Sequence, residues 1–423
     1  MTPRPPLARK GTPAPTLTGP FDPGGQPDLG PDKHLHLSLF AWNVSNGLSA
    51  SKVVLDDPES RQNAWQWKNS QRLLRLLDSS GMDSALQYGM WVGYGGEVEW
   101  NDHHYDWATA GAITAAVTER VGIFQTIHVG YNISPMFIAK QTAAVDHVSG
   151  GRGGVNIVAG QNAVDYAQFG LEGPPPQPIR YAIADEMTTA MKLLWTSDEP
   201  VDFEGEYFQL YGAQISPRAT SRPRPVLVNA AASPIGLDYA TRQCDALFVT
   251  ASGETWAEKA ARIHGMAAEH NRKVRVAAMC YVVMDDDQSK VDDLVEEMRR
   301  RIDREALENW LTMSGHIMAS EPGGENLVDK GLYGLDRQAS GAAADPYLGL
   351  GKEDYEELGM GMGAYQLFGT YEKVADELIE LYNLGIGQFA LCFLDPMKGV
   401  QQMKERVIPI LQSRGYNELA TAL

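Results

Sequence analysis

The segment from Gln141 to Gly170 holds the residues whose types and spacing best suit an active site. Apolar residues at helical spacing predict a helix that ends at the glycine pair 150–151, and a strand is predicted over 154–159. Asn156 and Gly160 then lie at or near the carboxyl end of that strand. In a parallel α/β barrel this end is the catalytic face, and a glycine there lets a flat ligand approach the backbone.

A second group of polar and aromatic residues follows the first two predicted strands. These residues suit the wall of a substrate pocket, and they are Trp42, Asn43, Trp91, Tyr94, Trp100, His103 and His104. His128, near the end of the third strand, is a weaker ligand candidate, because a lone histidine is more often structural. The run Asp102-His103-His104 also allows a metal-dependent hydrolase, but adjacent residues on one loop rarely converge on one metal.

The elements that position these residues alternate between strand and helix from His34 onward. Strands are predicted near 35–41, 84–88, 121–127, 154–159, 226–231, 246–250, 275–283 and 388–394. Helices are predicted near 65–79, 107–118, 135–148, 180–195, 234–242, 255–270, 288–304, 371–384 and 398–412. Eight strands with a helix after each indicate an α/β fold, a (β/α)8 TIM barrel.

One long segment interrupts the alternation of strands and helices, and another precedes it. A long insertion at about 305–368 comes before the last βα unit, where it serves either as a lid on the catalytic rim or as an oligomer contact. Residues 1–33 are rich in proline and glycine, which predicts a disordered or extended arm able to wrap a neighbouring subunit. We therefore expect one barrel domain over 34–415 and a short tail over 416–423.

Composition bounds the functional class. The net charge of −18 disfavours nucleic acid and anionic membranes as partners, since both require a basic surface. No apolar run reaches the length of a membrane span, and the first 33 residues lack the apolar centre of a secretory signal, so we expect a soluble, cytoplasmic protein. The 3 cysteines are far apart and form no C-x-x-C motif, which indicates buried thiols.

Several segments resemble the luciferase-like flavin monooxygenases. The DHVSGGR turn followed by NIVAG (146–160) is similar to the approach to their fourth strand. LHLSLFAWNVSNGL (35–48) resembles the first strand and loop of the dimethylsulfone and alkanesulfonate monooxygenases. YGGEVEWNDHHYDW (94–107), the Arg180-Tyr181 pair and LWTSDEPVDFEGEYFQL (194–210) resemble the pyrimidine (uracil) monooxygenases. The likeness covers roughly residues 34–415 in matching order.

The resemblance implies a site for FMN, whose ring needs small residues, an amide and exclusion of water. It places Asn156 beside the flavin. With Thr126, Asn156 would flank the point where dioxygen meets the reduced ring. It places phosphate contacts at Arg180 and Tyr181, near the start of one helix, and at Ser233, the N-cap of another, where backbone N–H groups favour an anion.

Several other positions match site positions of the family, and most of them hold different residues in this sequence. Asp165 matches an acidic flavin-pocket position but is one methylene shorter. Gly89 and Met90, also in the flavin pocket, stand where the pyrimidine enzyme has an apolar residue and a lysine, and the missing charge favours a neutral substrate. Gln161 replaces a usual tryptophan, which widens the pocket or makes it more polar. His103 matches a histidine and is expected to donate a proton or bind substrate.

The resemblance thus implies a two-component monooxygenase that acts through a flavin peroxide on dioxygen and a small organic substrate. A separate NAD(P)H-dependent flavin reductase supplies reduced FMN, because no G-x-G-x-x-G motif follows a strand. Cleavage of a carbon–sulfur bond or opening of a nitrogen heterocycle fits the family, and the uncharged Gly89-Met90 position with the nearby aromatic residues also suits a larger, neutral molecule. A homodimer or homotetramer fits the family as well. A deazaflavin-dependent oxidoreductase of the same barrel family and a non-catalytic flavin-binding protein are the alternatives.

Overall fold

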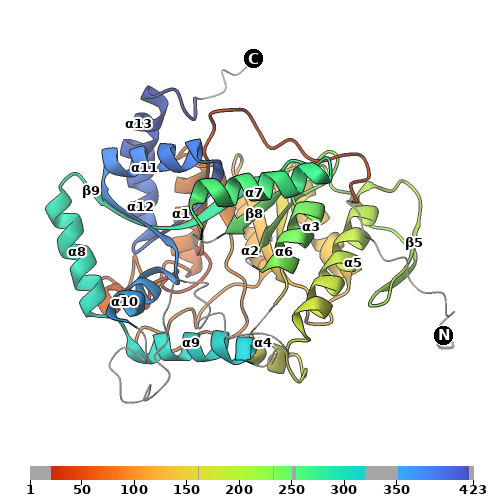
Figure 1. The fold of residues 1–423 in the computed structure, drawn as a ribbon, viewed down its shortest axis with the longest axis horizontal. Helices are drawn as coiled ribbons and strands as arrows, with labels where there is room; N and C mark the ends of the chain where they lie inside the picture. Colours follow the sequence, from red (N-terminus) through yellow and green to blue (C-terminus); the bar gives the residue numbers. More distant parts are fainter. Residues whose placement is uncertain (1–20, 161, 232, 250–253, 320–350, 419–423) are drawn as a thin grey trace.

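Eight parallel strands close into a barrel in this computed structural model, which describes residues 21–160, 162–231, 233–249, 254–319 and 351–418 (Figure 1). The barrel closes because β9 pairs with β8 on one side and β11 on the other. In barrel order the strands are β1 (His36–Phe40), β2 (Ser84–Leu86), β3 (Gly122–His128), β4 (Gly153–Val158), β7 (Val226–Ala230), β8 (Ala246–Val249), β9 (Arg275–Asp285) and β11 (Ile386–Phe393). The predicted (β/α)8 fold is confirmed, and every predicted strand overlaps one of these.

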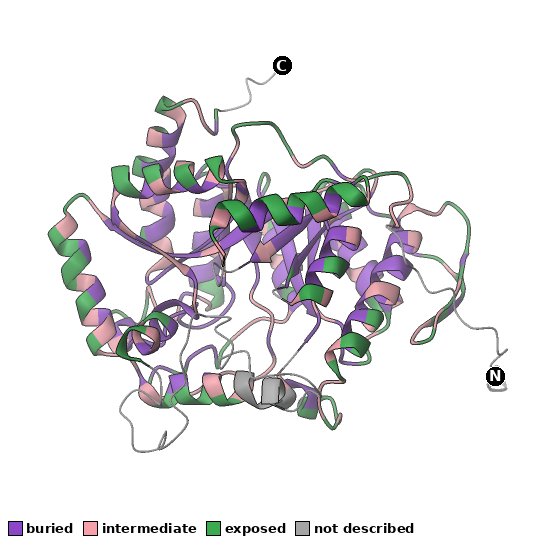
Figure 2. Ribbon diagram, in the orientation of Figure 1, coloured by how far each residue is buried: buried purple, intermediate pink, exposed green. Residues whose placement is uncertain are grey.

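Helices cover the outside of the barrel, with their outer faces exposed and their inner faces buried (Figure 2). They are α1 (Trp67–Asp78), α2 (Trp107–Val117), α3 (Pro135–Ser149), α5 (Gln177–Thr196), α6 (Pro234–Gln243), α7 (Trp256–Glu269), α8 (Gln288–Arg300), α11 (Tyr371–Asn383), α12 (Pro396–Gln402) and α13 (Ile408–Ser413). A π-helical turn, Met403–Val407, joins the last two. Within the described residues, no helix is long and apolar enough to cross a membrane.

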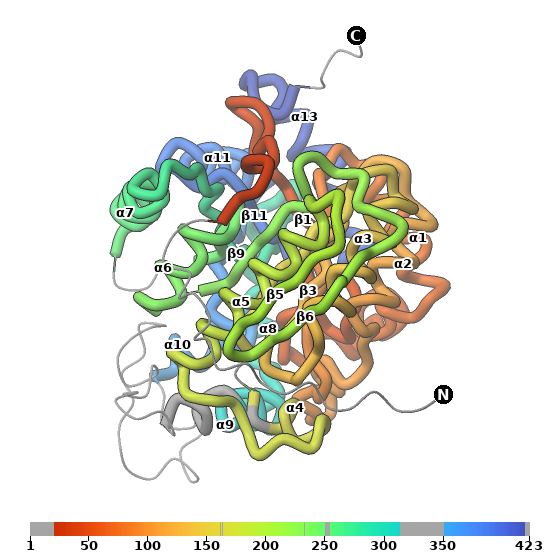
Figure 3. The backbone as a smooth tube through the Cα atoms, turned by 90° about the vertical axis from the view of Figure 1, so that its right-hand side faces the viewer, coloured from red at the N-terminus to blue at the C-terminus, as the bar shows by residue number. Residues whose placement is uncertain are grey.

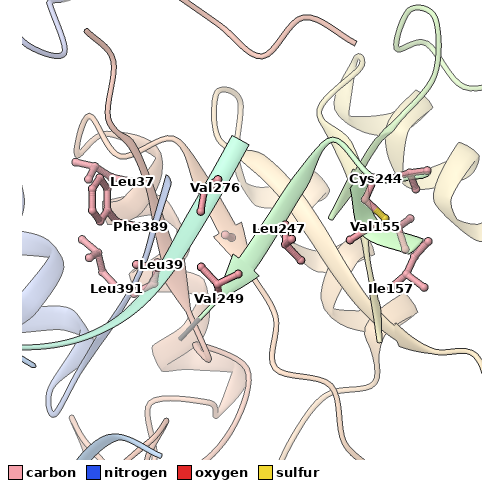
Figure 4. Packing of buried hydrophobic residues seen from close by; sticks show 14 of the residues in the cluster. Leu37, Leu39, Val155, Ile157, Cys244, Leu247, Val249, Val276, Phe389 and Leu391 are labelled. Carbon is pink, nitrogen blue, oxygen red and sulfur yellow. The ribbon is translucent and has the colours of Figure 1, made fainter. Parts of the chain in front are cut away.

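Successive side chains along each strand point to opposite faces of the sheet, so the strands contribute to two separate apolar layers. Side chains such as Val155, Ile157 and Leu247 face the surrounding helices and belong to the main core (Figure 4). A separate cluster that includes Phe124, Val228 and Ala390 lies inside the barrel. Because Asn156 lies between Val155 and Ile157, its side chain faces the barrel interior, on the same side of the sheet as Phe124 and Thr126.

The DHVSGGR turn fixes the start of β4. Gly150 caps α3 with a φ of 73°, a left-handed conformation that glycine adopts without strain. The Asp146 carboxylate accepts from the Gly153 amide at 3.0 Å and the Ser221 amide at 2.9 Å. The Arg152 guanidinium donates to the Thr118 carbonyl at 2.7 Å. The motif therefore anchors β4 beside β3 at the amino-terminal side of the barrel, remote from the catalytic face.

Residues 21–33, seen in red at the top of Figure 1, run across this amino-terminal side without forming a helix or strand. The Asp22 carboxylate accepts from Lys192 at 2.9 Å, from Arg224 at 2.7 Å and from Arg272 at 2.6 Å. All three basic side chains are buried, and Arg224 also pairs with Asp245 at 2.7 Å. This part of the arm is therefore docked on its own barrel. Residues 1–20 lie outside the described part of the chain.

The sequence patterns did not indicate several elements. They are the 3-10 turn Lys52–Asp56, α4 (Ala163–Gln168), the hairpin of β5 (Val201–Glu204) and β6 (Gln209–Ala213), α9 (Arg304–Ala319), α10 (Lys352–Gly361) and β10 (Tyr365–Thr370). The insertion at 305–368 contributes most of α9 and all of α10. Of its remaining residues, 320–350 lie outside the described part. β10 extends the sheet beside the second half of β9, where β8 has ended.

The insertion packs on the loops that follow β1 and β2. Together they form a second apolar core, which includes Val44, Trp100, Tyr281, Leu307 and Leu358. α9 lies beside α4 at the bottom of Figures 1 and 3, on the carboxyl-terminal side of the strands. The described part of the insertion therefore borders the barrel mouth, as the sequence predicts, while its role as a lid stays a prediction.

Candidate active site

Two polar residues meet on neighbouring strands inside the barrel. Thr126 of β3 and Asn156 of β4 are register partners, and each is only 5% exposed. The Asn156 Nδ2 donates to the Thr126 Oγ1 at 3.1 Å, and that hydroxyl donates to the Gln87 carbonyl. The Asn156 Oδ1 is buried and has no hydrogen-bond partner among the described residues. The pair therefore presents one unsatisfied acceptor.

A narrow cavity adjoins this pair. Its volume is about 10 Å³, which is room for about one water-sized molecule. It is lined by Gly89, Met90, Trp91, Tyr105, Asp106, Trp107, Thr126, His128, Tyr131 and Ile133. A side chain on Gly89 would place its Cβ 2.6 Å from the Thr126 Cγ2, so only glycine lets the loop after β2 lie this close to β3. The structure thus brings together five of the predicted site residues.

His128 is the histidine of this cavity. Burial lowers the pKa of His128 to about 4, so the ring is neutral at pH 7. The ring lies 5.3 Å from that of Tyr131. A neutral imidazole supplies one donor and one acceptor without bringing a charge into the cavity.

Asp165 ties three segments together at the mouth. Its carboxylate accepts from the backbone N–H groups of Trp91 at 3.2 Å and Val92 at 2.9 Å, and from the Tyr131 hydroxyl at 3.1 Å. Burial raises the pKa of Asp165 to about 6, against the lowering effect of these hydrogen bonds. In this arrangement Asp165 fixes the loop after β2, which carries the cavity residues.

The predicted phosphate contacts come from two helix starts. Ser233 caps α6, and its Oγ accepts from the Gly236 amide at 3.3 Å. A Cβ on Gly236 would lie 2.4 Å from the Tyr181 hydroxyl, so that hydroxyl reaches the first turn of α6. Arg180 is 4% exposed and donates to the Pro175 carbonyl at 2.8 Å. The structure therefore brings Tyr181 and Ser233 together and keeps Arg180 buried one residue away.

The predicted substrate wall does not converge on this cavity as a group. The His103 side chain is 47% exposed, stacks on Trp65 at 4.9 Å and lies 3.5 Å from Glu99, so it faces the outside. Asn43 is fully buried, and its amide donates to the Tyr88 carbonyl and accepts from the Tyr88 amide. Of the predicted wall residues, only Trp91 lines the cavity.

Three of the other wall residues, Trp42, Tyr94 and Trp100, are buried in the protein interior. Trp42 is 1% exposed and belongs to the main core. Tyr94 is 7% exposed, and its hydroxyl lies 3.0 Å from that of Tyr88. The Tyr88 hydroxyl also donates to the Met362 sulfur at 3.7 Å. The insertion therefore contacts the residues that follow β2.

The Asp102-His103-His104 run offers no metal geometry. Asp102 accepts from the Gly95 amide at 2.8 Å, and the His104 ring lies against the Asn101 carbonyl at 3.1 Å. Among the residues that the structure describes, no three His, Cys, Asp or Glu side chains gather as metal ligands. The three cysteines, Cys244, Cys280 and Cys392, are buried free thiols, as predicted. Gln161, predicted to widen the pocket, lies outside the described residues.

Sequence reasoning missed five cavity-lining residues, which are Tyr105, Asp106, Trp107, Ile133 and Tyr131, and it also missed Tyr166. Tyr131 and Tyr166 are the two that contact each other. Tyr131 follows β3 and closes one side of the cavity, and Tyr166 of α4 lies 4.9 Å from it, edge to face. Their signals were present in the sequence, since Tyr131 stands in the loop after a predicted strand and Tyr166 directly follows Asp165. Neither type of signal distinguishes a ligand contact from core packing.

Comparison with known proteins shows the family to which the chain belongs. Residues 50–388 match the family model of luciferase-like monooxygenases. The pyrimidine monooxygenase RutA of Escherichia coli O150:H5 is 30% identical over 340 residues, covering 79% of this chain and 82% of the relative. The FMNH2-dependent dimethylsulfone monooxygenase of Pseudomonas putida is 24% identical over 380 residues, covering 89% of this chain and 95% of the relative.

A solved structure shares the fold of this chain. The crystal structure of DmoA from Hyphomicrobium sulfonivorans superposes with a TM-score of 0.75 at 20% identity, over 91% of this chain and 90% of that one. The family match spans well over half of the sequence and includes both strands of the Thr126–Asn156 pair. The chain therefore belongs to the luciferase-like monooxygenases, a family of flavin-dependent enzymes.

Proposed function

We propose that this protein uses reduced FMN to insert one oxygen atom of dioxygen into a small, neutral organic substrate. The observation that carries the proposal is the buried, unsatisfied Oδ1 of Asn156 beside Thr126. A buried acceptor without a partner costs about 1–3 kcal/mol, which a ligand donor would remove. The isoalloxazine ring carries N–H donors along its edge, and the Asn156 Oδ1 can accept from one of them. The residue therefore fits this cofactor.

Some of the site residues would bind the cofactor, and others would position it or handle a proton. Reduced FMN, when bound, supplies the electrons that activate dioxygen. Asn156 orients the ring through its Oδ1, and the cavity at Thr126, with room for about one water-sized molecule, is too small for a flavin. The neutral His128 ring can hold or pass a proton beside that cavity. Arg180, Tyr181 and the Ser233 cap bind the phosphate at the other end of the cofactor.

The cavity lining supports a neutral substrate. Among its described residues the only charged side chain is Asp106, whose carboxylate caps α2 by accepting from the Ala108 amide at 3.0 Å and the Thr109 amide at 3.1 Å. Met90 stands where a relative carries a lysine, and it is 5% exposed. A sulfonate would meet no cation here. The cavity has room for about one water-sized molecule, so the substrate would lie against this lining and not inside it. The uncharged lining favours small sulfones and nitrogen heterocycles over sulfonates, with cleavage of a carbon–sulfur or carbon–nitrogen bond.

The proposal includes two protein partners. An NAD(P)H-dependent flavin reductase would supply the reduced FMN; the Pseudomonas putida relative is a monooxygenase that depends on FMNH2. A second copy of the chain is the other partner, because α2 is apolar around most of its circumference and neighbouring α3 exposes Phe137 (51%) and Val148 (66%). Exposed apolar faces of this kind mark subunit contacts.

Stopped-flow absorbance tests the proposed function. The protein, loaded anaerobically with reduced FMN, is mixed with oxygenated buffer in the presence and absence of neutral sulfones and heterocycles. We expect flavin reoxidation that differs from that of free FMN, a rate that changes with the correct substrate, and incorporation of one 18O atom from 18O2 into product. Reoxidation identical to free FMN would refute the proposal, and binding of a reduced deazaflavin in its place would favour hydride transfer.

A further inference from the structure

The Tyr166 hydroxyl is a buried polar group that the protein itself leaves unsatisfied. Tyr166 lies on α4 and is 1% exposed. Its hydroxyl has no hydrogen-bond partner among the described residues. Buried hydroxyls are nearly always paired, so an unpaired one in a site region indicates a missing ligand or water. None of the functions assigned above uses this group.

The surroundings of the hydroxyl place it at the barrel mouth. A Cβ on Gly130 would lie 1.7 Å from the Tyr166 Oη, and one on Gly160 would lie 3.2 Å from it. Gly130 follows β3 by two residues, and Gly160 follows β4 by two residues. The hydroxyl therefore reaches the ends of the same two strands that carry Thr126 and Asn156. Residues with side chains at either glycine would displace it.

The electrostatic environment favours an anion on this side. Burial raises the pKa of Tyr166 to about 12, while the positive charge of Arg180 acts in the opposite direction. Tyr166 is thus a neutral donor at pH 7, and Arg180 is near enough to influence it. Arg180 precedes Tyr181, whose hydroxyl reaches the first turn of α6. Tyr166 therefore lies within electrostatic reach of Arg180, one of the residues suited to a phosphate.

The ring is also held rigidly. It packs edge to face on Tyr131 at 4.9 Å, and the Tyr131 hydroxyl is fixed by Asp165 at 3.1 Å. A donor held in one orientation loses little conformational entropy when it binds a ligand.

We propose that the Tyr166 hydroxyl donates a hydrogen bond to the phosphate of the bound flavin mononucleotide, next to Arg180. This assignment rests on the proposed function, because it requires that the chain bind a phosphorylated flavin. It adds a contact from α4 to those from α5 and α6. The cofactor would then hold α4 against the barrel mouth, and the enzyme would select FMN over riboflavin through this neutral donor as well as through arginine.

Anaerobic fluorescence titration with reduced FMN and reduced riboflavin tests the assignment. Tyr166→Phe removes only the unpaired oxygen, so we expect the dissociation constant for FMN to rise about tenfold, as for loss of a hydrogen bond to a charged group, and that for riboflavin to stay unchanged. The thermal midpoint of the flavin-free protein should not fall, because no protein hydrogen bond is lost.

Tyr239→Phe is the matched control. Its hydroxyl is buried as well but pairs with Thr188 at 2.6 Å. This variant should lower the thermal midpoint and leave the preference for FMN over riboflavin intact. Unchanged FMN affinity in Tyr166→Phe, equal loss of both flavins, or a fall in its thermal midpoint would each overturn the assignment. A wild-type protein that binds neither flavin would instead refute the proposed function itself.

Discussion

The Asn156 Nδ2 donates to the Thr126 Oγ1 at 3.1 Å, and this bond decides which atom of Asn156 remains for a ligand. One N–H of the amide and the threonine hydroxyl are engaged within the protein, and the atom of Asn156 that has no partner among the described residues is the acceptor Oδ1. An acceptor orients a ring N–H but does not stabilise a developing negative charge. The Oδ1 of Asn156 is therefore suited to hold the flavin through a ring N–H.

Asn156→Ala should uncouple oxygen use from product formation. Loss of the amide removes one neutral hydrogen bond, about 1 kcal/mol, so reduced FMN should still bind with an affinity reduced roughly fivefold. The ring would be less well oriented, and more hydrogen peroxide should be released per oxygen consumed. Thr126→Ser, which keeps the hydroxyl, serves as the control and should stay coupled. Coupling equal to wild type in Asn156→Ala would show that the residue is only structural.

Arg180→Ala should weaken FMN binding through the phosphate. A charge-assisted contact contributes about 1.5–3 kcal/mol, so the dissociation constant for reduced FMN should rise roughly 10- to 100-fold. Riboflavin, which lacks the phosphate, should bind as before. Arg262→Ala is the matched control, because Arg262 is half exposed and pairs with Glu254 at 2.8 Å on the outer helix α7. Equal affinities of the Arg180 variant and wild type for FMN would remove the phosphate assignment.

Asp22→Asn should destabilise the whole barrel. The substitution leaves Lys192, Arg224 and Arg272 with less negative charge in a buried cluster, and breaking such a cluster costs about 3–5 kcal/mol. Urea unfolding would measure the loss. Asp32→Asn, an exposed change in the same arm, should alter stability by less than about 0.5 kcal/mol. Similar unfolding curves for both variants would show that the arm is not part of the stable core.

The same carboxylate predicts an acid limit. Burial alone would raise the pKa of Asp22, but Lys192, Arg272 and Arg224 outweigh it and hold the pKa at about 2, below the usual 3.8. The stabilisation is complete above pH 4 and is lost as the pH falls through 2, and it amounts to about 2 kcal/mol. The difference in unfolding free energy between wild type and Asp22→Asn should therefore shrink between pH 4 and pH 2. A constant difference would contradict this linkage.

Gly89→Ala should disturb the cavity. The new Cβ would lie 2.6 Å from the Thr126 Cγ2 and 3.0 Å from the Thr126 carbonyl oxygen, and the carbonyl is backbone that cannot rotate away. Overpacking of this kind costs about 1–3 kcal/mol, and reduced FMN should bind more weakly. Gly265→Ala in α7 meets nothing within 4 Å and should instead stabilise the protein by about 0.5–1 kcal/mol. Thermal unfolding of the two variants measures both effects: the midpoint should fall in Gly89→Ala and rise in Gly265→Ala.

Local sequence patterns were sufficient for the framework. All eight barrel strands lie where alternating or continuous apolar runs predict them. The signal for a buried strand is the pattern of apolar residues within the strand itself, which the sequence shows directly. The placement of Asn156 at a strand end followed from the same pattern. α4 and α10 were missed because they are short and carry little helical periodicity of their own, and the hairpin β5–β6 lies outside the barrel rhythm.

Only the tertiary structure decided which side chains meet. His103 looked suited to the site and is exposed, whereas His128 lines the cavity with Thr126. Asp22 and Arg272 are 250 residues apart in the sequence yet form a bond of 2.6 Å. The local order of apolar and polar residues determined the strands and helices, since the periodicity of each element lies in neighbouring residues. The partners of Asp22, Asn156 and Tyr166 depend on the closure of the barrel, which brings distant segments together and leaves some polar atoms unpaired.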